Sequence, residues 1–390
     1  MTNTSFMISV VFIVAVASNL SSCFIKTTVW TAVKERIQRD SNLEKYLEDI
    51  KFVLDEAASF NLYSTESFKE SVEGGLVLDV QRDKKKFWAK LLFEEDHKFS
   101  KCENFKVFEK EEFNKIKYVQ KMSKREAFTR KVFNKEDNSL IKEIHACIVI
   151  FEDYNININL KDTNIFDNDS IKNWPILFRF FGRLIQAVAE INFRAKLLHG
   201  DIRPENILLV VKKNVNPELM DVEPVIFNFD SKLEYSAFVK KPDQKLRYAL
   251  VYRPPEMRQA TTKSEKFSEG DWNKNWKNYE FSDQLVEDTY ALGVTIDEVL
   301  KKQINNVNKN SDEYREFRIL VDQMMSARYK EPYVKSKNLT MLRPSMKNVI
   351  WEFGLIISKC QICKTNTITK DVKDEIEAVS HSLNTQQGYI

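Results

Sequence analysis

The sequence predicts an α+β fold in which a small antiparallel sheet precedes a mainly helical region. Residues 71–80 (SVEGGLVLDV) and 85–93 (KKFWAKLLF) are short, rich in β-forming residues and separated by a charged turn, which is typical of a hairpin. Residues 127–134 (AFTRKVFN) and 144–152 (IHACIVIFE) predict two more strands. From about residue 174 the pattern is mainly helical, interrupted by the β-like stretches ILLVV and PVIFNFD. A sheet followed by helices favours an α+β chain over alternating β and α units.

Length and composition set the limits of this fold. The chain has 390 residues, of which 43% are hydrophobic, so a sizeable core can form and bulk disorder is not expected. The formal net charge is +3, from 60 basic and 57 acidic residues. Because this balance gives no overall basic surface, we expect no nucleic acid among the partners of the chain.

The first residues predict a secretory leader. Residues 6–14 (FMISVVFIV) form an apolar run that is too short to span a bilayer as a helix. Ala15, Val16 and Ala17 then fit the small-residue pattern of a cleavage site. We therefore expect residues 1–17 to be a signal peptide, the mature chain to be secreted or lumenal, and no stable membrane span to remain after cleavage. A membrane anchor and a buried N-terminal helix are the alternatives.

The rest of the chain divides into four predicted regions. Residues 18–66 carry apolar side chains at helical spacing, such as Leu43, Leu47, Ile50 and Leu54, and predict an N-terminal helical extension. The sheet-rich region is expected at 67–153 and the mainly helical region at 154–357. Residues 358–390 are expected to form a C-terminal tail.

The five cysteines, Cys23, Cys102, Cys147, Cys360 and Cys363, do not suggest a disulfide framework in a domain of this size. Cys360 and Cys363 have the C-x-x-C spacing but no second pair and no nearby His, so a zinc site is not expected. A local disulfide between these two residues and two unpaired buried cysteines remain open alternatives.

One segment carries a specific motif. Residues 199–206 read His-Gly-Asp-Ile-Arg-Pro-Glu-Asn and are followed by the β-like run ILLV. This resembles the catalytic loop of the protein kinase family, in its serine/threonine-like form. In that family the aspartate orients the substrate hydroxyl and the asparagine five residues later holds a metal ion. The resemblance assigns these roles to Asp201 and Asn206.

Further matches to the family lie upstream and downstream, in the family's order. Phe87-Trp-Ala-Lys90 resembles the strand with the phosphate-binding lysine. Residues 105–121 have helical periodicity, and Glu112 lies in this run, where that lysine's partner is expected. Asn228-Phe-Asp230 lies where Asp-Phe-Gly belongs. Residues 252–256 (YRPPE) resemble the end of the activation segment, and residues 288–293 (DTYALG) resemble a buried helix of the family.

The resemblance covers residues 67–357 and implies a two-lobed protein kinase fold with a sheet and one helix in the smaller lobe. It also implies ATP and Mg²⁺ as cofactors and a protein substrate or partner. His199 and Phe229 would be packed core residues, and Glu256 and Arg343 a buried ion pair. The implied site residues are Asp201 and Arg203 for catalysis, Lys90, Glu112, Gly75, Val77, Trp88 and Glu152 for the nucleotide, and Asn206, Asn228 and Asp230 for the metal.

The loop expected to cover the phosphates departs from the family. With Val77 aligned to the valine of G-x-G-x-x-G-x-V, the three glycine positions hold Glu70, Val72 and Gly75. Glycines let the backbone approach phosphates closely, and a glutamate adds a like charge. This loop is therefore expected to bind phosphates poorly.

Three more departures concern the chemistry. Asn228 replaces an aspartate, and a neutral amide is a poorer Mg²⁺ ligand than a carboxylate. Arg203 replaces a lysine, which keeps the charge but changes its geometry. Trp88 replaces a small alanine two residues before Lys90, so it should point where adenine would lie. A register shift of one residue would turn Trp88 to the other face of the sheet.

These departures favour a pseudokinase that acts as a binding or regulatory module and has little use for ATP and Mg²⁺. The alternative is an active serine/threonine kinase in which Asp201 is the catalytic base. In this alternative Asp230, two residues after Asn228 in the chain, supplies the carboxylate that Asn228 lacks. Other transferase chemistry on the same kind of fold, such as phosphorylation of a small molecule, is a third candidate.

Overall fold

A computed structural model describes the chain over much of its length. The described residues are 63–70, 76–82, 85–94, 102, 104–133, 140–152, 159–161, 174–212, 221–229, 233–234, 251–252, 286–302, 311–326, 343–360, 373–374, 376–378 and 381. The chain divides into two compact units, the first formed by residues 1–110 and 121–155 and the second by residues 111–120 and 156–390. Both contain strands, and the helices of the second make the protein a mixed α+β chain, as the sequence predicts.

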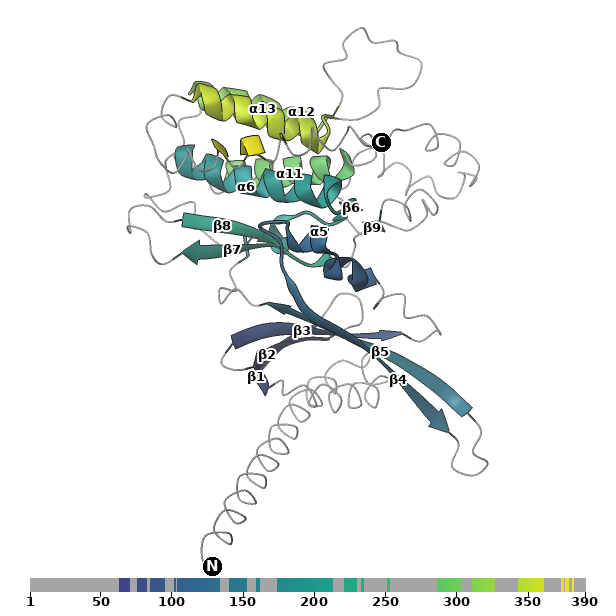
Figure 1. Ribbon diagram of the computed structural model, residues 1–390. Helices are drawn as coiled ribbons and strands as arrows, with labels where there is room; N and C mark the ends of the chain where they lie inside the picture. The colour runs from purple at the N-terminus through teal and green to yellow at the C-terminus, as the bar shows by residue number, and fades with distance from the viewer. Residues whose placement is uncertain are drawn as a thin grey trace, which may run out of the picture. The chain divides into compact units, whose positions relative to one another are not determined.

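The first unit is built on a five-stranded antiparallel sheet with the strand order β1-β2-β3-β5-β4 (Figure 1). Its strands are β1 (Tyr63–Glu70), β2 (Leu76–Arg82), β3 (Lys85–Glu94), β4 (Met122–Phe133) and β5 (Leu140–Glu152). The predicted hairpin is β2–β3, in which Arg82 pairs with Lys85 across the turn. The sheet begins earlier than expected, because β1 starts at Tyr63, within the range expected to be helical.

A short 3-10 helix, η1 (Asn104–Glu109), lies against one face of this sheet. The ring of Phe151 in β5 contacts Phe105 and Phe108, each at 6.0 Å between centroids. The Arg125 side chain of β4 donates to Glu109 Oε1 at 3.0 Å, which fixes the end of η1 to the sheet. Strand alternation places the Phe151 ring on one face of β5, and the contacts with η1 bury it there.

A disulfide between Cys102 and Cys147 ties the chain before η1 to β5, with 5.5 Å between the Cα atoms. Its partners are 45 residues apart in sequence, and closing a loop of that length removes unfolded-state entropy worth about 4 kcal/mol. No local sequence pattern distinguishes this pair among the five cysteines. Cys360 is also disulfide-bonded, whereas Cys363 lies outside the described residues.

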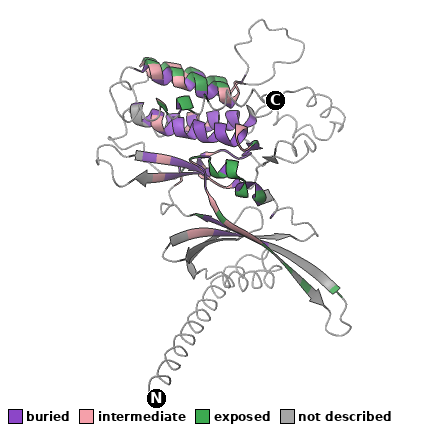
Figure 2. Cartoon of the chain, in the orientation of Figure 1, coloured by how far each residue is buried: buried purple, intermediate pink, exposed green. Residues whose placement is uncertain are grey.

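The second unit contains four long helices: α6 (Trp174–Phe193), α11 (Val286–Lys302), α12 (Asp312–Met324) and α13 (Met346–Lys359). Helix α6 is buried along most of its length and packs against α13, α11 and strand β8 (Figure 2). Rings from three helices form the centre of this core, where Phe178, Phe317 and Phe353 contact one another at 5.5 to 5.7 Å between centroids.

Local sequence explains where two of these helices begin. The Ser311 hydroxyl accepts a hydrogen bond from the Tyr314 backbone N–H at the start of α12. Ser345 does the same for the Asn348 N–H at the start of α13. Serine at this position satisfies a backbone donor that the first turn leaves unpaired. Among the described residues, no helix combines the length and apolar character needed to cross a membrane.

Two short strand pairs complete the second unit. Strand β7 (Ile207–Lys212) pairs with β8 (Asp221–Ile226), and β6 (Leu197–Leu198) pairs with β9 (Leu233–Glu234). The β7–β8 pair corresponds to the two β-like stretches that the sequence places within the helical region, and α6 packs on β8. The segment that links β6 to β7 contains the 199–206 motif.

The helix expected over residues 105–121 is not continuous, and this prediction was wrong. After η1 comes a single helical turn, α5 (Glu111–Asn114), which is followed by a turn, bends and an isolated β-bridge between Val119 and Ile226. The backbone of Lys117 donates to Glu190 Oε2 on α6 at 3.2 Å, and Gln120 donates to the Ile226 carbonyl at 2.8 Å. Docking on α6 and β8 thus replaces helical hydrogen bonds with tertiary ones, and residues 111–120 join the second unit.

The close approach of α11 and α12 gives a test of this packing. A Cβ added at Gly293 of α11 would lie 2.8 Å from Met324 Cβ, whereas one added at Gly354 of α13 would meet Ile376 Cγ2 at an ordinary 3.5 Å. Alanine favours a helix over glycine by about 1 kcal/mol, but overpacking costs about 1–3 kcal/mol. We expect Gly293→Ala to lower the free energy of unfolding measured by urea denaturation, and Gly354→Ala to raise it. Equal stabilisation by both variants would contradict the helix contact.

Candidate functional site

The 199–206 motif forms a loop that a buried carboxylate holds in place. Asp288 of α11 is fully buried, and its Oδ2 and Oδ1 atoms accept the backbone N–H groups of His199 at 2.7 Å and Gly200 at 3.1 Å. Gly200 has φ 76°, a conformation that glycine adopts without steric strain. The backbone N–H groups of the first two loop residues, His199 and Gly200, are therefore both hydrogen-bonded.

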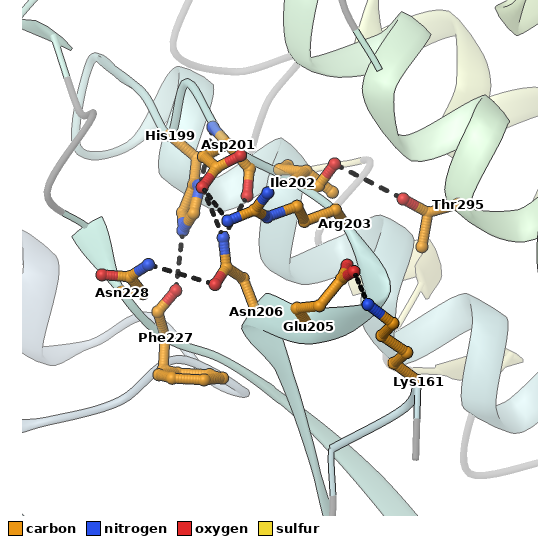
Figure 3. Close-up of polar contacts among 10 residues, drawn as sticks. All are labelled: Lys161, His199, Asp201, Ile202, Arg203, Glu205, Asn206, Phe227, Asn228 and Thr295. Carbon is orange, nitrogen blue, oxygen red and sulfur yellow. Dashed lines mark hydrogen bonds and ion pairs between the residues drawn. The ribbon is translucent and has the colours of Figure 1, made fainter. Parts of the chain in front are cut away.

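Two more side chains support this anchor. Asn192 of α6 is buried and donates to both the Leu197 carbonyl and Asp288 Oδ2, each at 2.9 Å. Thr295 of α11 donates to the Ala291 carbonyl at 2.8 Å. Its hydroxyl also lies 3.4 Å from the Ile202 carbonyl, a contact drawn in Figure 3. Side chains of both α6 and α11 thus hold the loop between β6 and β7 in place.

The His199 ring links the loop to the segment after β8. Its Nε2 atom lies 3.0 Å from the Phe227 carbonyl, and its centroid is 4.5 Å from the Phe229 ring. Phe229 in turn contacts Phe113 of α5 edge-on, at 5.4 Å. The three rings form a packed row, which is the core role that the sequence assigns to His199 and Phe229.

Asp201 lies at the centre of the loop's polar groups (Figure 3). Its Oδ2 atom accepts from Asn206 Nδ2 at 2.7 Å and lies 3.3 Å from Arg203. Asp201 is only 4% exposed, and its Oδ1 atom is buried without a hydrogen-bond partner. An unpaired carboxylate oxygen is an acceptor available to a hydroxyl group.

Burial is the main cause of a raised pKa at Asp201. The charges of Arg203 and His199 and the hydrogen bond from Asn206 act in the opposite direction, while the Glu205 carboxylate adds to the increase. Asp201 therefore binds a proton more tightly in the folded protein than in the unfolded chain. A carboxylate in such a setting is better suited to accept a proton than one in water.

Asn206 and Asn228 are joined directly. Asn228 Nδ2 donates to Asn206 Oδ1 at 3.1 Å, and Asn206 Nδ2 also donates to the Asp201 carbonyl at 2.8 Å. Asn228 has φ 62°, a left-handed conformation that asparagine tolerates better than most residues. The amide oxygen of Asn206 that would bind a metal is therefore occupied by an N–H of Asn228.

A second ion pair lies beside the loop, between Lys161 and Glu205 at 2.7 Å. Burial alone would raise the pKa of Glu205, but the hydrogen bond and charge of Lys161, with the charge of Arg203, leave this pKa below its ordinary value. Glu205 is thus held ionised next to Arg203. Lys161 lies outside the motifs that the sequence shares with the kinase family.

Predicted nucleotide residues of the first unit lie on its sheet. Trp88 and Lys90 are two apart on β3 and so share a face, with Phe151 directly opposite Trp88 on β5. Lys90 is buried, Trp88 is half-buried and Glu152 at the end of β5 is exposed. Val77 on β2 pairs with Lys90 across the strands.

The remaining predicted residues are distributed differently. Glu112 is exposed on α5, whose buried residue is Phe113. Three predicted residues lie outside the described part of the chain: Gly75, Asp230 and Glu256. Glu256 is the residue expected to pair with Arg343. Within the described part of the chain, no group of three or more His, Cys, Asp and Glu side chains is arranged to hold a metal ion.

Arg343 is nevertheless buried, as its expected role in the core requires. Its Nε and Nη2 atoms donate to the Ser326 carbonyl at 3.1 and 3.0 Å, and its guanidinium lies 4.9 Å from the Tyr290 ring centroid. The side chain therefore joins the end of α12 to α11. The expected pair with Glu256 stays a prediction.

The structure adds two groups that sequence reasoning missed. Asn192 is a polar residue within an otherwise apolar helical run, which was the available signal for a buried hydrogen-bonding role. Tyr252 donates its hydroxyl to Glu298 of α11, and burial followed by this hydrogen bond raises the pKa of the tyrosine. No local pattern marks Glu298, because its partner is distant in sequence.

No known family model matches the sequence, and no curated protein matches it. Many solved structures show similarity, including one described as "Crystal structure of BubR1 kinase domain". That structure is 12% identical in sequence, with coverage of 82% of this chain and 85% of the solved chain and a TM-score of 0.44.

The raised pKa of Asp201 predicts a stability effect that depends on pH. The favourable contribution of a carboxyl with a raised folded pKa is fully present below its unfolded pKa, about 3.9, and is lost as the pH rises through the folded value. Asp201→Asn keeps the shape without the charge. We therefore expect this variant to be more stable than the wild type at neutral pH, with a difference in stability that shrinks as the pH falls.

Thermal or urea unfolding from pH 4 to pH 8 would measure this difference. Asp322→Asn is the matched control, because Asp322 is largely exposed on α12 and pairs with Arg318 at the surface. A loss of stability in Asp201→Asn at neutral pH would show that the Arg203 pair and the Asn206 hydrogen bond outweigh the cost of burial.

Proposed function

We propose that this chain is a protein-kinase-like binding module, a pseudokinase with weak or absent phosphate transfer. Support for the fold comes from a five-stranded antiparallel sheet preceding a helical unit and from the motif loop between paired strands. The family's order of motifs on the sequence agrees with this arrangement. The proposal concerns the role of the chain, since fold alone does not decide activity.

The observation that carries the proposal is the hydrogen bond from Asn228 to Asn206. A Mg²⁺ ion needs oxygen ligands, yet the Asn206 amide oxygen accepts the Asn228 N–H, and Asp201 Oδ2 accepts the Asn206 N–H. Two hydrogen bonds thus link the three side chains without a cation. A metal ion at Asn206 Oδ1 would compete with the Asn228 N–H for this oxygen.

A second candidate, active serine/threonine phosphorylation, is favoured by one specific observation. Asp201 keeps a buried, unpartnered Oδ1 atom and a raised pKa, as expected for a group that accepts the proton of a substrate hydroxyl. In this alternative Asp230 would supply the carboxylate that Asn228 lacks. The two candidates differ in their need for a divalent metal.

We also propose that the protein resides in the secretory route or outside the cell. The Cys102–Cys147 disulfide supports this location, because disulfides persist in oxidising compartments. Cys360 is disulfide-bonded as well. The apolar run at residues 6–14 and the following Ala-Val-Ala supply the corresponding leader.

A metal dependence test separates the two functional candidates. The melting temperature of the full chain would be measured with ATP alone and with ATP plus Mg²⁺ or Mn²⁺. A ligand at 100 times its Kd adds about 2.7 kcal/mol of stability, so a metal-assisted site gives a clear increase. We expect no metal-dependent increase for the wild type and a measurable one for Asn228→Asp, which restores a carboxylate.

Asn348→Asp serves as the control for added charge, because Asn348 is exposed in the first turn of α13. Phosphate transfer from labelled ATP would be followed in the same samples. Metal-dependent stabilisation of the wild type, together with transfer that Asp201→Ala abolishes, would overturn the pseudokinase proposal and establish the active kinase.

The location predicts a processed and oxidised chain. When the full chain is expressed through a secretory route, N-terminal sequencing should find a start near Ser18, and mass spectrometry should find Cys102 linked to Cys147. Asn168-Asp-Ser and Asn338-Leu-Thr would be available for N-glycosylation. Native protein that retains Met1 and carries both cysteines as free thiols would contradict this location.

A further inference from the structure

Helices α12 and α13 lie side by side in the second unit and turn apolar side chains outward. Of the five large apolar side chains that the described residues expose, three are on these two helices: Ile319 is 58% exposed, Trp351 56% and Leu355 39%. The opposite sides of both helices are buried in the core around Phe317 and Phe353. Apolar residues that are exposed singly need no explanation, but a group of them on neighbouring helices marks a candidate binding surface.

Two polar contacts fix how the helices run. Lys359 Nζ at the end of α13 lies 3.4 Å from Glu316 Oε2 in α12, near the start of that helix. At the other end, Arg343 just before α13 donates to the carbonyl of Ser326 just after α12. The helices are therefore antiparallel.

This direction brings the three exposed apolar residues together. Ile319 is three residues after Glu316 and Leu355 is four residues before Lys359, so both lie about one helical turn from the same ion pair and on the same side of it. Trp351 is one further turn along α13. We call the surface that these three residues form, with the adjacent Glu352, the α12–α13 face.

The charges of the two helices leave an acidic excess at this face. Three cations are paired within the chain: Arg315 with Asp312, Arg318 with Asp297 and Asp322, and Lys359 with Glu316. The fourth, Lys347, also interacts within the chain. Among the residues that the structure describes, Glu313 and the exposed Glu352 have no ion-pair partner. The charge available to a partner at the α12–α13 face is therefore negative.

We propose that the α12–α13 face binds a basic amphipathic helix of a partner protein. The apolar stripe of that helix would cover Trp351, Leu355 and Ile319, and a Lys or Arg beside the stripe would pair with Glu352. An exposed tryptophan at the centre suits this role, because tryptophan is enriched among the residues that dominate binding energy. Two antiparallel helices can accept a third helix along their common groove.

Two other occupants fit less well. A second copy of this chain would bring the same acidic excess to the same face. The amphipathic stretch at residues 43–56 of this chain has five acidic and two basic residues, so its charge is also of the wrong sign. The inference rests on the proposed binding role and names its surface.

The test uses the full chain and a labelled peptide of about 18 residues, made of Leu and Lys with the leucines in one helical stripe. One control peptide replaces every Lys by Glu, and the other has the same composition in an order without a stripe. Fluorescence anisotropy would measure binding, and hydroxyl-radical footprinting with mass spectrometry would locate it. We expect the striped basic peptide alone to bind and to lower the oxidation of Trp351 at least threefold, with no change at the buried Trp174.

Two matched pairs of variants identify the contacts. Trp351→Ala should weaken peptide binding at least tenfold, whereas Leu140→Ala, which truncates a similarly exposed apolar side chain on β5, should not. Glu352→Lys should also weaken it at least tenfold, whereas Glu111→Lys, the same charge change at an exposed residue of α5, should not. Because Glu352 is exposed, its variant should keep the melting temperature of the wild type, which separates lost binding from lost folding.

Three results would overturn the proposal. The first is equal binding of the striped basic peptide and either control peptide. The second is Trp351 as resistant to oxidation as Trp174 in the free protein, which would show that another part of this chain covers the face. The third is a concentration-dependent dimer in sedimentation that Trp351→Ala abolishes, which would assign the face to a second copy. These readouts need neither ATP nor a metal, so their failure is distinct from a failure of the pseudokinase proposal.

Discussion

The buried carboxylate of Asp288 positions the loop on which the candidate site is built. It accepts N–H groups from His199, Gly200 and Asn192, and so connects α11 to α6 and to the end of β6. Each of these donors would cost about 1–3 kcal/mol if it were buried without a partner. One side chain thus fixes the backbone from which Asp201 and Asn206 project, and the geometry of every polar group in the loop follows from it.

Within the loop, the polar groups largely satisfy one another. The chain of contacts from Asp201 through Asn206 to Asn228 engages Asp201 Oδ2 and Asn206 Oδ1. The same close packing removes Asp201 from water and raises its pKa. Asp201 Oδ1 is the buried oxygen of this carboxylate that these contacts leave without a hydrogen bond.

The two units obtain their order by different means. The second has aromatic rings and buried hydrogen bonds at its centre, whereas the sheet of the first is held to η1 by a disulfide, an ion pair and stacked phenylalanines. The disulfide attaches to β5 at Cys147, which pairs with Leu92 of β3 inside the sheet.

The sequence by itself determined the α+β class, the β2–β3 hairpin and the 199–206 loop, because these depend on local periodicity and on residues close together in the chain. It could not determine that the helix expected over 105–121 would end at Asn114, since docking of Lys117 and Gln120 on distant elements outweighs local helix propensity. Nor could it pair Cys102 with Cys147, whose proximity is set by the position of η1 against β5. The amide contact between Asn206 and Asn228 likewise depends on β7 and β8 being adjacent. Only the tertiary structure, which brings separated residues within hydrogen-bonding distance, decided how the site satisfies its own polar groups.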